Sequence, residues 1–571
     1  MRCVIYILLF YACIAFSFAQ NVLPKNYFSL PIAGRLVLSG SFGELRPDHF
    51  HSGIDFSTQN KENVEVLSIA AGYVSRIKIS ATGYGKVIYI THPNGLVSVY
   101  AHLGAFNVVV DDYVKKKQYE QKTFEIELFP NRALFPVKKG DIIGYSGNSG
   151  ASSGPHLHFE IRSELTEHPI NPLFSGMFPH ETEKPFFQAL ALYPKGSNSL
   201  VNGQDEALIM SVPPNKKDKG PGMNDTIRVQ GNIAFGFEAY DRSSAEGNCG
   251  IYSGEILIDS VPFFKVSFDS LSFDEGRYVN IMKDYQAYIE TGKEIIQSYI
   301  APGNRLKFYP LITHNGMYYC NDTNYHCITF IAKDFYGNSA QQNIVLKSQK
   351  VVTVPVKAEE NDRPLYRYGL KWHFEAPKVI VDLPADALYD SVYFDYRLMR
   401  GTRQTWSDIH HIHDASVPIH SYVLLKIKPD TLLPGLDPAK LTMARLVKNS
   451  FTYVKSEWAE GYITAKIRSF GNYCIVADTV PPVIKPVGNI TNRKINPGDL
   501  IRFTITDDFS GIDTYNLTIN GKWVLAEYDA KSDRLTYTAE ATHFSKGSNT
   551  LALTVTDKLK NQQVYSTVVV Y

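Results

Sequence analysis

Short alternations of apolar and polar residues recur along the chain, whereas long helical periods are few. The stretch "FEIEL" at 124–128 alternates Phe124, Ile126 and Leu128 with two glutamates, as a half-buried strand requires. The stretches "KVIVDLPADALYDSVYFDY" at 378–396 and "YITAKIRSFGNYCIVAD" at 462–478 also have strand character. This pattern predicts a mainly β protein.

Composition supports this expectation and narrows the class of protein. The chain has 571 residues, of which 44% are hydrophobic, and typical domain sizes then predict about three to five domains. The 36 tyrosines and 32 phenylalanines also favour strands. Because 58 Lys and Arg residues nearly cancel 57 Asp and Glu residues, the chain lacks the basic field that nucleic-acid binding requires. We therefore expect no nucleic-acid partner.

The N-terminus "MRCVIYILLFYACIAFSFAQ" resembles a cleaved export signal, residues 1–19, with cleavage after Ala19. It has one early positive charge, an apolar run too short for a comfortable membrane span, and small residues at its end. Cys13 is a poor lipid-attachment site because the bulky Phe10 and Tyr11 precede it. No later stretch is long and apolar enough to cross a bilayer. We expect an exported mature chain with no transmembrane segment, which is periplasmic, envelope-associated or secreted.

Four cysteines follow the predicted signal: Cys249, Cys320, Cys327 and Cys474. An oxidising compartment allows disulfides, and we expect Cys320 and Cys327, the pair closest in sequence, to be bridged. No CxxC pair is present, so the cysteines do not predict a structural zinc cluster.

Two histidine-containing stretches predict a metal site. In "HSGID" at 51–55, His51 and Asp55 can reach one ion if Gly53 allows a tight turn. In "SGPHLHFEI" at 153–161, His156 and His158 project from the same face of a strand. An isolated HxH is more often a pair of half-exposed histidines than a metal site. With His158 as a third ligand, however, the two stretches describe a zinc site with an open fourth position.

The motifs "HSGID", "YAHL" at 100–103, "VKKGDIIGYSGNSGASSGPHLHFEI" at 137–161 and "PINPL" at 169–173 occur in one order. Together they resemble the M23 peptidases, the lysostaphin and LytM type of zinc endopeptidase that cuts peptidoglycan cross-bridges. The resemblance covers about residues 30–175. It implies an antiparallel-sheet peptidase domain in which His51, Asp55 and His158 bind zinc, and His102 and His156 are the unligated active-site histidines.

The chemistry of these residue types agrees with the resemblance. Zinc supplies Lewis acidity, while one imidazole accepts a proton and another stabilises an oxyanion. The sequence leaves open which of His102 and His156 does which. It contains no HExxH motif that would supply a glutamate base.

Other histidines are expected to be bystanders. Because the HxGxD spacing selects His51 as the ligand, we expect His49 either to contact a metal ligand without binding the metal or to lie on the surface. The tract "HHIHDASVPIH" contains His410, His411, His413 and His420 but no cysteine, and we expect a solvated loop there rather than a metal site.

The connection between His102 and His156 is longer than the family usually shows, and the added part includes "DDYVKKKQYEQKTFEIELFPNRALF". The alternation at 124–128 and the turn signal at Pro130 and Asn131 predict an inserted hairpin. It either borders the substrate groove or is a neutral surface insertion.

The chain beyond residue 178 has no further catalytic motif and shows an internal repeat. "IAFGFEAYDRSSAEGNCGIYSGEILIDS" with "CITFIAKDFYGNSAQ" resembles "IRFTITDDFSGIDTYNLTINGKWV" with "LALTVTDKLKNQQ", and both predict a β-sandwich module. The aspartates of these turns suggest calcium, but aspartate in a turn more often bonds the backbone, so we favour the structural role. They are Asp241, Asp334, Asp507, Asp508 and Asp557.

Proline-rich and polar stretches mark the expected joints at 213–225, 355–364 and "DTVPPVIKPV" from Asp478. The first of these could instead be a loop within a module. The expected domains are a peptidase domain at 28–178, a β-sandwich at 179–355, a β-rich domain at 360–476 and an Ig-like β-sandwich at 478–571.

These observations predict an exported zinc metalloendopeptidase whose partner is peptidoglycan. The substrate class is implied by the resemblance alone. Two alternatives belong to other classes: a non-enzymatic wall-binding or amidase-activating protein of the LytM type, and an adhesin or scaffold built on the β-sandwich modules. The complete ligand set argues against the first, since such relatives typically lose ligands. The sequence does not indicate an oligomeric state.

Overall fold

The computed structural model describes residues 23–24, 26–33, 36–178, 180–213, 226–242, 247–352, 363–430 and 437–571. The predicted export signal at 1–19 lies outside the described residues, as do most of the predicted joints at 213–225 and 355–364. Strands dominate the described residues, as expected. No helix in this part of the chain combines the length and apolarity needed to span a membrane.

The N-terminal region, residues 36–178, is built on one sheet with the central order β1-β2-β10-β6-β5-β4-β7. Every pairing in this sheet is antiparallel, as expected. Its strands are β1 (Leu38–Gly40), β2 (Ile54–Ser57), β3 (Glu65–Leu67), β4 (Gly72–Ile79), β5 (Lys86–Thr91), β6 (Leu96–Phe106), β7 (Ile126–Leu128), β8 (Pro136–Val137), β9 (Ile142–Ser146), β10 (His156–Ser163) and β11 (Pro169–Ile170).

The connection between β6 and β9 contains a helix, so the prediction of an inserted hairpin was wrong. Helix α1 (Val108–Gln121) precedes β7, which pairs with β4. Asn107 caps the helix by accepting a hydrogen bond from the backbone of Val110, and Val110, Val114 and Gln118 form its buried stripe. This four-residue spacing places the three side chains on one face of the helix. The strand expected at 124–128 is present as β7.

The second region, residues 180–352, forms another sheet with the order β13-β12-β14-β22-β21-β16-β17-β19. Its helices α2 (Val279–Met282) and α3 (Tyr285–Thr291) are short. Its strands are β12 (Phe186–Val201), β13 (Leu208–Ser211), β14 (Ile227–Asp241), β15 (Cys249–Gly250), β16 (Ser253–Ile258), β17 (Val261–Ser267), β18 (Ile296–Gln297), β19 (Leu311–Ile312), β20 (Met317–Cys320), β21 (Tyr325–Lys333) and β22 (Ser339–Ser348). One continuous apolar core joins this region to the N-terminal region.

The third region, residues 363–478, encloses a separate core between two five-stranded sheets, β24-β25-β29-β33-β32 and β27-β28-β34-β30-β31. Its strands are β23 (Leu365–Tyr366), β24 (Trp372–Ala376), β25 (Val379–Leu383), β26 (Val392–Tyr393), β27 (Tyr396–Met399), β28 (Ile409–Ile412), β29 (Pro418–Ile427), β30 (Leu441–Val447), β31 (Ser450–Val454), β32 (Ser456–Ala459), β33 (Tyr462–Ser469) and β34 (Gly471–Ala477).

The C-terminal region, residues 479–571, has two four-stranded sheets around its own core, β35-β36-β40-β39 and β38-β37-β41-β42. Its strands are β35 (Val483–Pro486), β36 (Leu500–Thr506), β37 (Ile512–Ile519), β38 (Lys522–Trp523), β39 (Glu527–Asp529), β40 (Arg534–Thr538), β41 (Ser548–Asp557) and β42 (Gln562–Val570). Short 3₁₀ turns lie at Pro172–Ser175, Phe273–Tyr278, His314–Gly316, Pro438–Lys440 and Ala541–His543.

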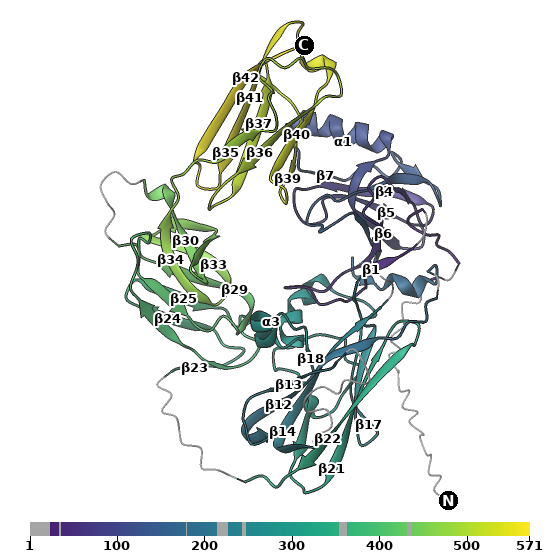
Figure 1. Cartoon of the computed structure of the whole chain (residues 1–571), viewed down its shortest axis with the longest axis vertical. Helices are drawn as coiled ribbons and strands as arrows, with labels where there is room; N and C mark the ends of the chain where they lie inside the picture. Colours follow the sequence, from purple (N-terminus) through teal and green to yellow (C-terminus); the bar gives the residue numbers. More distant parts are fainter. Residues whose placement is uncertain are drawn as a thin grey trace, which may run out of the picture.

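The C-terminal region returns to the N-terminal region and packs against α1, as Figure 1 shows. Tyr119 of α1 stacks edge-on against Trp523 and lies 3.3 Å from Nε2 of His543 through its hydroxyl. Lys115 pairs with Glu540 at 2.8 Å. The insertion between β6 and β9 therefore serves as the contact surface for the last region of the chain.

The expected bridge between Cys320 and Cys327 is absent, and both residues are free thiols. Cys320 is buried at the end of β20, whereas Cys327 is exposed on β21. Because one side chain points into the core and the other into solvent, proximity in sequence does not bring the sulfurs together.

The prediction of a solvated loop at 410–420 was also wrong. Residues Ile409–Ile412 form β28, and His410 and His413 are only 1% and 6% exposed. Ile409 and Ile412 are buried in the same stretch, and this apolar pair places the tract against the core. The described histidines of this tract belong to no group of metal-ligating side chains.

Candidate metal centre and active site

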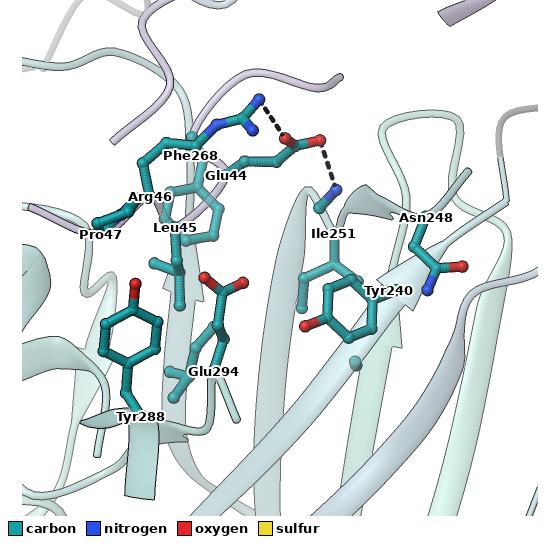
Figure 2. Close-up of a pocket in the computed structure, with 14 residues that line it drawn as sticks. Glu44, Leu45, Arg46, Pro47, Tyr240, Asn248, Ile251, Phe268, Tyr288 and Glu294 are labelled. Atoms are coloured by element: carbon teal, nitrogen blue, oxygen red, sulfur yellow. Dashed lines mark hydrogen bonds and ion pairs between the residues drawn. The ribbon is translucent and has the colours of Figure 1, made fainter. Parts of the chain in front are cut away.

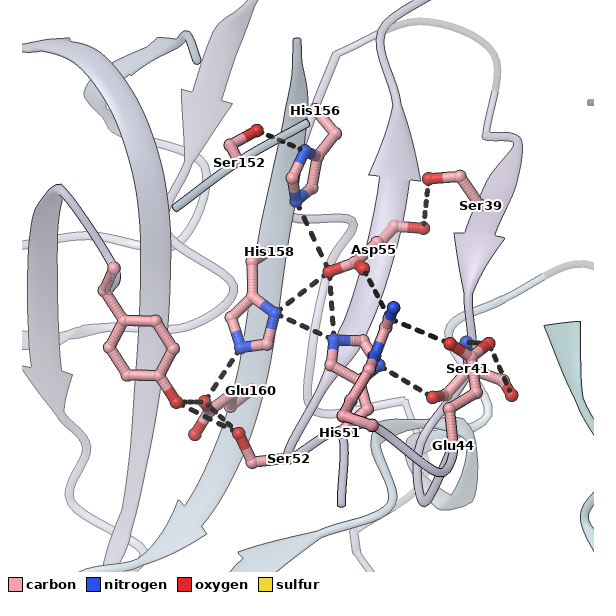
Figure 3. Close-up of polar contacts among 12 residues, drawn as sticks. Ser39, Ser41, Glu44, His51, Ser52, Asp55, Ser152, His156, His158 and Glu160 are labelled. Carbon is pink, nitrogen blue, oxygen red and sulfur yellow. Dashed lines mark hydrogen bonds and ion pairs between the residues drawn. The ribbon is translucent and has the colours of Figure 1, made fainter. Parts of the chain in front are cut away.

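The pairing of two strands places the first two candidate ligands opposite each other. Strands β2 and β10 are antiparallel neighbours, and in their register Asp55 faces His158. His51 lies in the turn before β2, where its Nδ1 donates to the carbonyl of Ser41 at 2.7 Å. Figure 3 shows the three side chains converging on one point from β2, β10 and this turn.

Their ligand atoms are close enough to share one ion. His51 Nε2 lies 3.1 Å from Asp55 Oδ1, and His158 Nδ1 lies 2.9 Å from the same oxygen. The two ring nitrogens are 3.0 Å apart. All three residues are less than a tenth exposed. His51, Asp55 and His158 therefore form a candidate metal site, and such a site has two imidazole nitrogens and one carboxylate.

This donor set fits zinc. Zinc bonds of about 2.0–2.1 Å in a tetrahedron place neighbouring ligand atoms roughly 3.3 Å apart, close to the separations found here. Each imidazole also bonds an acceptor through its other nitrogen, His51 to Ser41 and His158 to Glu160. In the neutral rings, those bonds leave the inner nitrogens without hydrogen and aimed at the shared point.

Glu160 is a part of the centre that the motif analysis missed. Its carboxylate is fully buried and accepts from His158 Nε2 at 2.8 Å and from Ser52 at 2.8 Å. Tyr84 and Arg162 also bond this carboxylate, each at 2.5 Å. The one available signal was spacing: Glu160 lies two residues after His158 in a strand and so shares its face.

Gly53 is required by close approach rather than by a left-handed turn. A Cβ at this position would lie 2.3 Å from the carbonyl oxygen of Phe159 and 3.0 Å from Cε1 of His158. Only glycine lets the turn after His51 approach β10 this closely. The tight turn expected between His51 and Asp55 therefore rests on the missing side chain.

His102 and His156 lie beside the candidate metal site. Their ring centroids are 4.7 Å apart, and His156 Nε2 lies 3.6 Å from Asp55 Oδ1. His102 Nδ1 donates to the carbonyl of Ser149 at 2.9 Å, and His156 Nδ1 donates to that of Gly154 at 2.9 Å. In both neutral rings Nε2 is therefore the proton-accepting nitrogen.

Burial keeps both of these rings neutral. It lowers the pKa of His102 to about 3, with further contributions from His158 and His156. Burial also lowers the pKa of His156, against the opposing effect of Asp55. Since an ordinary histidine titrates near 6.5, both rings are neutral at pH 7, and Nε2 of each is unprotonated.

For His158 and Asp55, in contrast, the pKa shifts favour the charged forms. Burial opposes a charge on His158, but hydrogen bonds to Asp55 and Glu160 prevail and raise its pKa to about 9. Burial likewise opposes the charge on Asp55, but His51 and His158 hold its pKa well below the usual range. In the metal-free centre a proton on His158 offsets the buried carboxylates. Binding of a metal ion must release that proton.

A pocket of about 320 Å³ lies between residues 43–47 and the second region (Figure 2). Glu44 on its wall bonds the backbone of Gly250 at 3.0 Å and pairs with Arg46 at 2.8 Å. Arg46 in turn lies 3.5 Å from Asp55 Oδ2. The second region therefore contacts the segment that leads to His51. His49, two residues before His51, is exposed and pairs with Asp48 instead of entering the centre.

The comparisons with known proteins match two parts of the chain. Peptidase family M23 matches residues 49–119 and 135–172. These ranges include the five candidate site residues, His51, Asp55, His102, His156 and His158. Residues 120–134, which include the end of α1 and β7, fall between the two matched stretches. A Zu5-like domain matches residues 364–478.

Two curated relatives are similar to the N-terminal region. The DD-carboxypeptidase/endopeptidase Mpg of Neisseria meningitidis serogroup B (strain ATCC 13091 / M2091) is 32% identical over 123 residues, which are 22% of this chain and 22% of Mpg. Lysostaphin of Staphylococcus simulans is 32% identical over 111 residues, 19% of this chain and 17% of lysostaphin. The alignments thus cover about a fifth of each relative.

A solved structure was also matched, the catalytic domain of the antimicrobial peptidase lysostaphin from Staphylococcus simulans. It is 23% identical, covers 24% of this chain and 90% of that domain, and has a TM-score of 0.19.

Proposed function

Residues 49–172 of this chain form an M23 peptidase domain, and from that premise we propose that the protein is an exported zinc metalloendopeptidase that hydrolyses peptide bonds of peptidoglycan stems or cross-bridges. The observation that carries the proposal is the convergence of His51, Asp55 and His158, with separations of 2.9–3.1 Å among their ligand atoms. Peptidoglycan as the substrate class follows from the family resemblance.

We assign His51, Asp55 and His158 to zinc, and His102 and His156 to proton transfer. A zinc ion held by the first three would supply Lewis acidity that activates water and polarises a carbonyl. His102 and His156 would accept a proton from the attacking water at Nε2, since both rings are neutral at pH 7. The ring that has gained the proton can then donate it to the leaving amine or stabilise the oxyanion.

Glu160 is assigned a positioning role in this function. It holds His158 through Nε2 and is itself held by Arg162, which offsets its charge in the buried setting. Such outer partners fix the tautomer and orientation of a metal-bound imidazole.

The remaining regions are proposed to be three β-sandwich domains, with boundaries at 179–355, 360–476 and 478–571. Two of them have two sheets around one core, in residues 366–475 and 490–569. Their role is proposed to be the placement of the peptidase domain at the cell wall.

A digestion of purified sacculi tests the proposed function. We expect the zinc-loaded protein to release muropeptides that mass spectrometry identifies as products of peptide-bond cleavage, and we expect His51→Ala to release none. Intact sacculi after treatment with a fully zinc-loaded protein would contradict the proposal. Binding of that protein to sacculi without cleavage would favour the wall-binding alternative.

A further inference from the structure

A second group of acidic side chains lies in the C-terminal region, where the chain enters it. Asp478, Asp507 and Asp557 each offer one carboxylate oxygen, and these oxygens all lie within 4.8 Å of one another. Asp478 is 3% exposed and Asp557 is fully buried. Three like charges this close in a buried place repel one another strongly unless a cation or protons offset them.

Nearby basic side chains do not supply that charge. The ion pairs within the described C-terminal region join Arg493 to Asp499, Lys560 to Asp513 and His543 to Glu540, and none of them includes a member of the group. The group is therefore three carboxylates without a basic partner among the ion pairs of this region.

Two oxygens of the group are buried without any hydrogen-bond partner among the described residues. Asp478 Oδ1 accepts from the backbone of Val480 at 3.3 Å, and Asp507 Oδ2 accepts from the backbone of Gly511 at 2.7 Å. Asp478 Oδ2 and Asp507 Oδ1 accept nothing. Buried carboxylate oxygens are rarely left without a donor or an ion, because their desolvation is costly when nothing replaces water.

The third carboxylate has a structural role that does not account for these two oxygens. Asp557 accepts from the backbone and the side chain of Asn561, at 2.8 and 2.7 Å. Asp334 makes the same two bonds to Asn338, at 2.8 and 2.6 Å. The backbone-bonding role expected for these turn aspartates is thus confirmed for Asp241, Asp334, Asp507 and Asp557. The oxygens of Asp478 and Asp507 that accept no hydrogen bond require a further explanation.

The same arrangement occurs in the second region. Glu181, Asp241 and Asp334 also have oxygens within 4.8 Å of one another. A cavity of about 30 Å³, enough for an ion or a water molecule, is lined by all three.

The positions correspond as well as the residue types. In each group one acid precedes the first strand of its region, as Glu181 does before β12 and Asp478 before β35. A second acid lies at the end of β14 or just after β36, and the third lies just after β21 or at the end of β41. The recurrence of three acids at equivalent places argues against a chance cluster.

We propose that Asp478, Asp507 and Asp557 bind a calcium ion that fixes the joint between the third and C-terminal regions. Calcium is selected because all donors are oxygens and the donor set is rich in carboxylates, with room left for water ligands. Asp478 is the last residue matched by the Zu5-like domain, so an ion there holds both sides of the joint.

Equilibrium dialysis of the full chain against calcium, after treatment with EGTA, tests this proposal. We expect the wild type to bind one calcium ion at this group and Asp507→Asn to lose it. Asp508→Asn is the matched control, because Asp508 is exposed and lies outside the group; it should bind calcium like the wild type. Absence of binding at about 10 mM calcium, above the range of extracellular modules, would overturn the proposal. Equal binding by wild type and Asp507→Asn would also overturn it for this group.

A second measurement guards against misfolding of the variant. Hydrogen exchange of wild-type residues 478–483 should slow when calcium is added, and Asp508→Asn should behave identically. Unchanged exchange would contradict a calcium ion at the joint. Zinc content and muropeptide release, measured on the same samples, separate failure of this proposal from failure of the proposed peptidase function.

Discussion

His102 adopts a left-handed backbone conformation, with φ of 59°, inside the irregular strand β6. Residues other than glycine pay an energetic cost for this conformation, and the cost is sustained where surrounding contacts hold it. Here the backbone NH of His102 donates to the carbonyl of Tyr84 at 3.0 Å, and its ring donates to Ser149. The strain turns the imidazole toward His156 instead of along the strand.

Substitution of the histidines separates metal binding from proton transfer. His158→Ala should lose both zinc and peptidoglycan hydrolysis, because only two metal ligands would remain. His156→Ala and His102→Ala should keep zinc and lose hydrolysis by about two to four orders of magnitude, the usual worth of a positioned acid or base. Zinc content and muropeptide release of the three variants check this. Wild-type turnover by His156→Ala would contradict the assignment.

Glu160→Gln is predicted to weaken zinc binding without removing a ligand. The amide holds His158 less firmly and leaves Arg162 without its buried partner, so the zinc dissociation constant should rise about 10–100-fold. Competition with a chromogenic chelator measures it. Glu164→Gln, an exposed position on the same segment, is the control and should bind zinc like the wild type. Equal affinities in the two variants would rule out the positioning role.

Local spacing predicted the proximity of candidate residues within each of the two histidine-containing stretches, and the family resemblance implied that the two stretches meet. The supporting contacts depend on the rest of the fold. His51 and Asp55 are four residues apart, and His156 and His158 share a strand face by the alternation of side chains. Tyr84 and Ser52 reach Glu160 from 76 and 108 residues away, so no local pattern points to them.

At the scale of elements, α1 depends on its cap. Asn107 Oδ1 accepts from Val110 at 3.0 Å, and Asn107→Ala should destabilise the helix by about 0.5–2 kcal/mol. Hydrogen exchange of residues 108–121 should therefore quicken. Asn107→Asp keeps an acceptor at the same place and should leave exchange near the wild-type rate. Equal exchange in Asn107→Ala and the wild type would show that packing alone holds the helix.

Strand β28 gives the third region a dependence on pH. Burial lowers the pKa of His410 and of His413 to about 4. The folded region takes up these protons only near pH 4, while the unfolded chain takes them up near 6.5. Their contribution is complete above about pH 6.5 and is lost as pH falls toward 4, at about 1–2 kcal/mol for each ring at pH 5.

Hydrogen exchange of residues 409–413 at pH 7.5 and 5, corrected for the intrinsic rate, measures this loss. The double variant His410→Gln and His413→Asn should lose less protection on acidification than the wild type. His373→Asn is the control, because His373 is exposed and its pKa is raised by Asp382. A wild type that is equally protected at both pH values would contradict the prediction.

The helix α1 and the buried tract at β28 were the elements that pattern reasoning missed. In α1 the helical period was carried by Val110, Val114 and Gln118, and the polar Gln118 concealed it. In β28 the histidines outweighed Ile409 and Ile412 in the reading of the sequence, although the isoleucines decide burial. The alternation at β7 was clear because its polar positions are charged.

At the scale of the whole molecule, Tyr119 is the residue to test. It contacts Trp523 and His543 and accepts from the backbone of Leu525 at 3.4 Å. Ion pairs at the same surface, such as Lys115 with Glu540, are exposed and contribute about 0–1 kcal/mol each. Tyr119→Ala should therefore release the C-terminal region, and small-angle scattering should show a larger radius of gyration.

Lys116→Ala provides the matched comparison for Tyr119→Ala. Lys116 lies on the same helix and is exposed, and its truncation should leave the radius of gyration unchanged. If Tyr119→Ala also left it unchanged, the contact at α1 would be too weak to hold the C-terminal region in solution.

The succession of strand-rich regions could be predicted from alternation and from proline-rich joints, but their return onto α1 could not. That contact joins residues more than 400 positions apart, such as Tyr119 and His543, through side chains that are ordinary surface residues in each partner. Complementarity of two distant surfaces leaves no trace in the local order of residues.

The contact at α1 makes the chain a closed linkage in the mechanical sense. The N-terminal and second regions share a core, the third region contacts the second where Arg277 bonds Ile419, and the C-terminal region meets the third at Asp478. Because the C-terminal region contacts α1 of the N-terminal region, rotation at any one joint requires a compensating rotation at another joint or separation at α1. Tension applied between the C-terminal region and the peptidase domain would accordingly travel along two routes, one through the covalent chain and one through the helix.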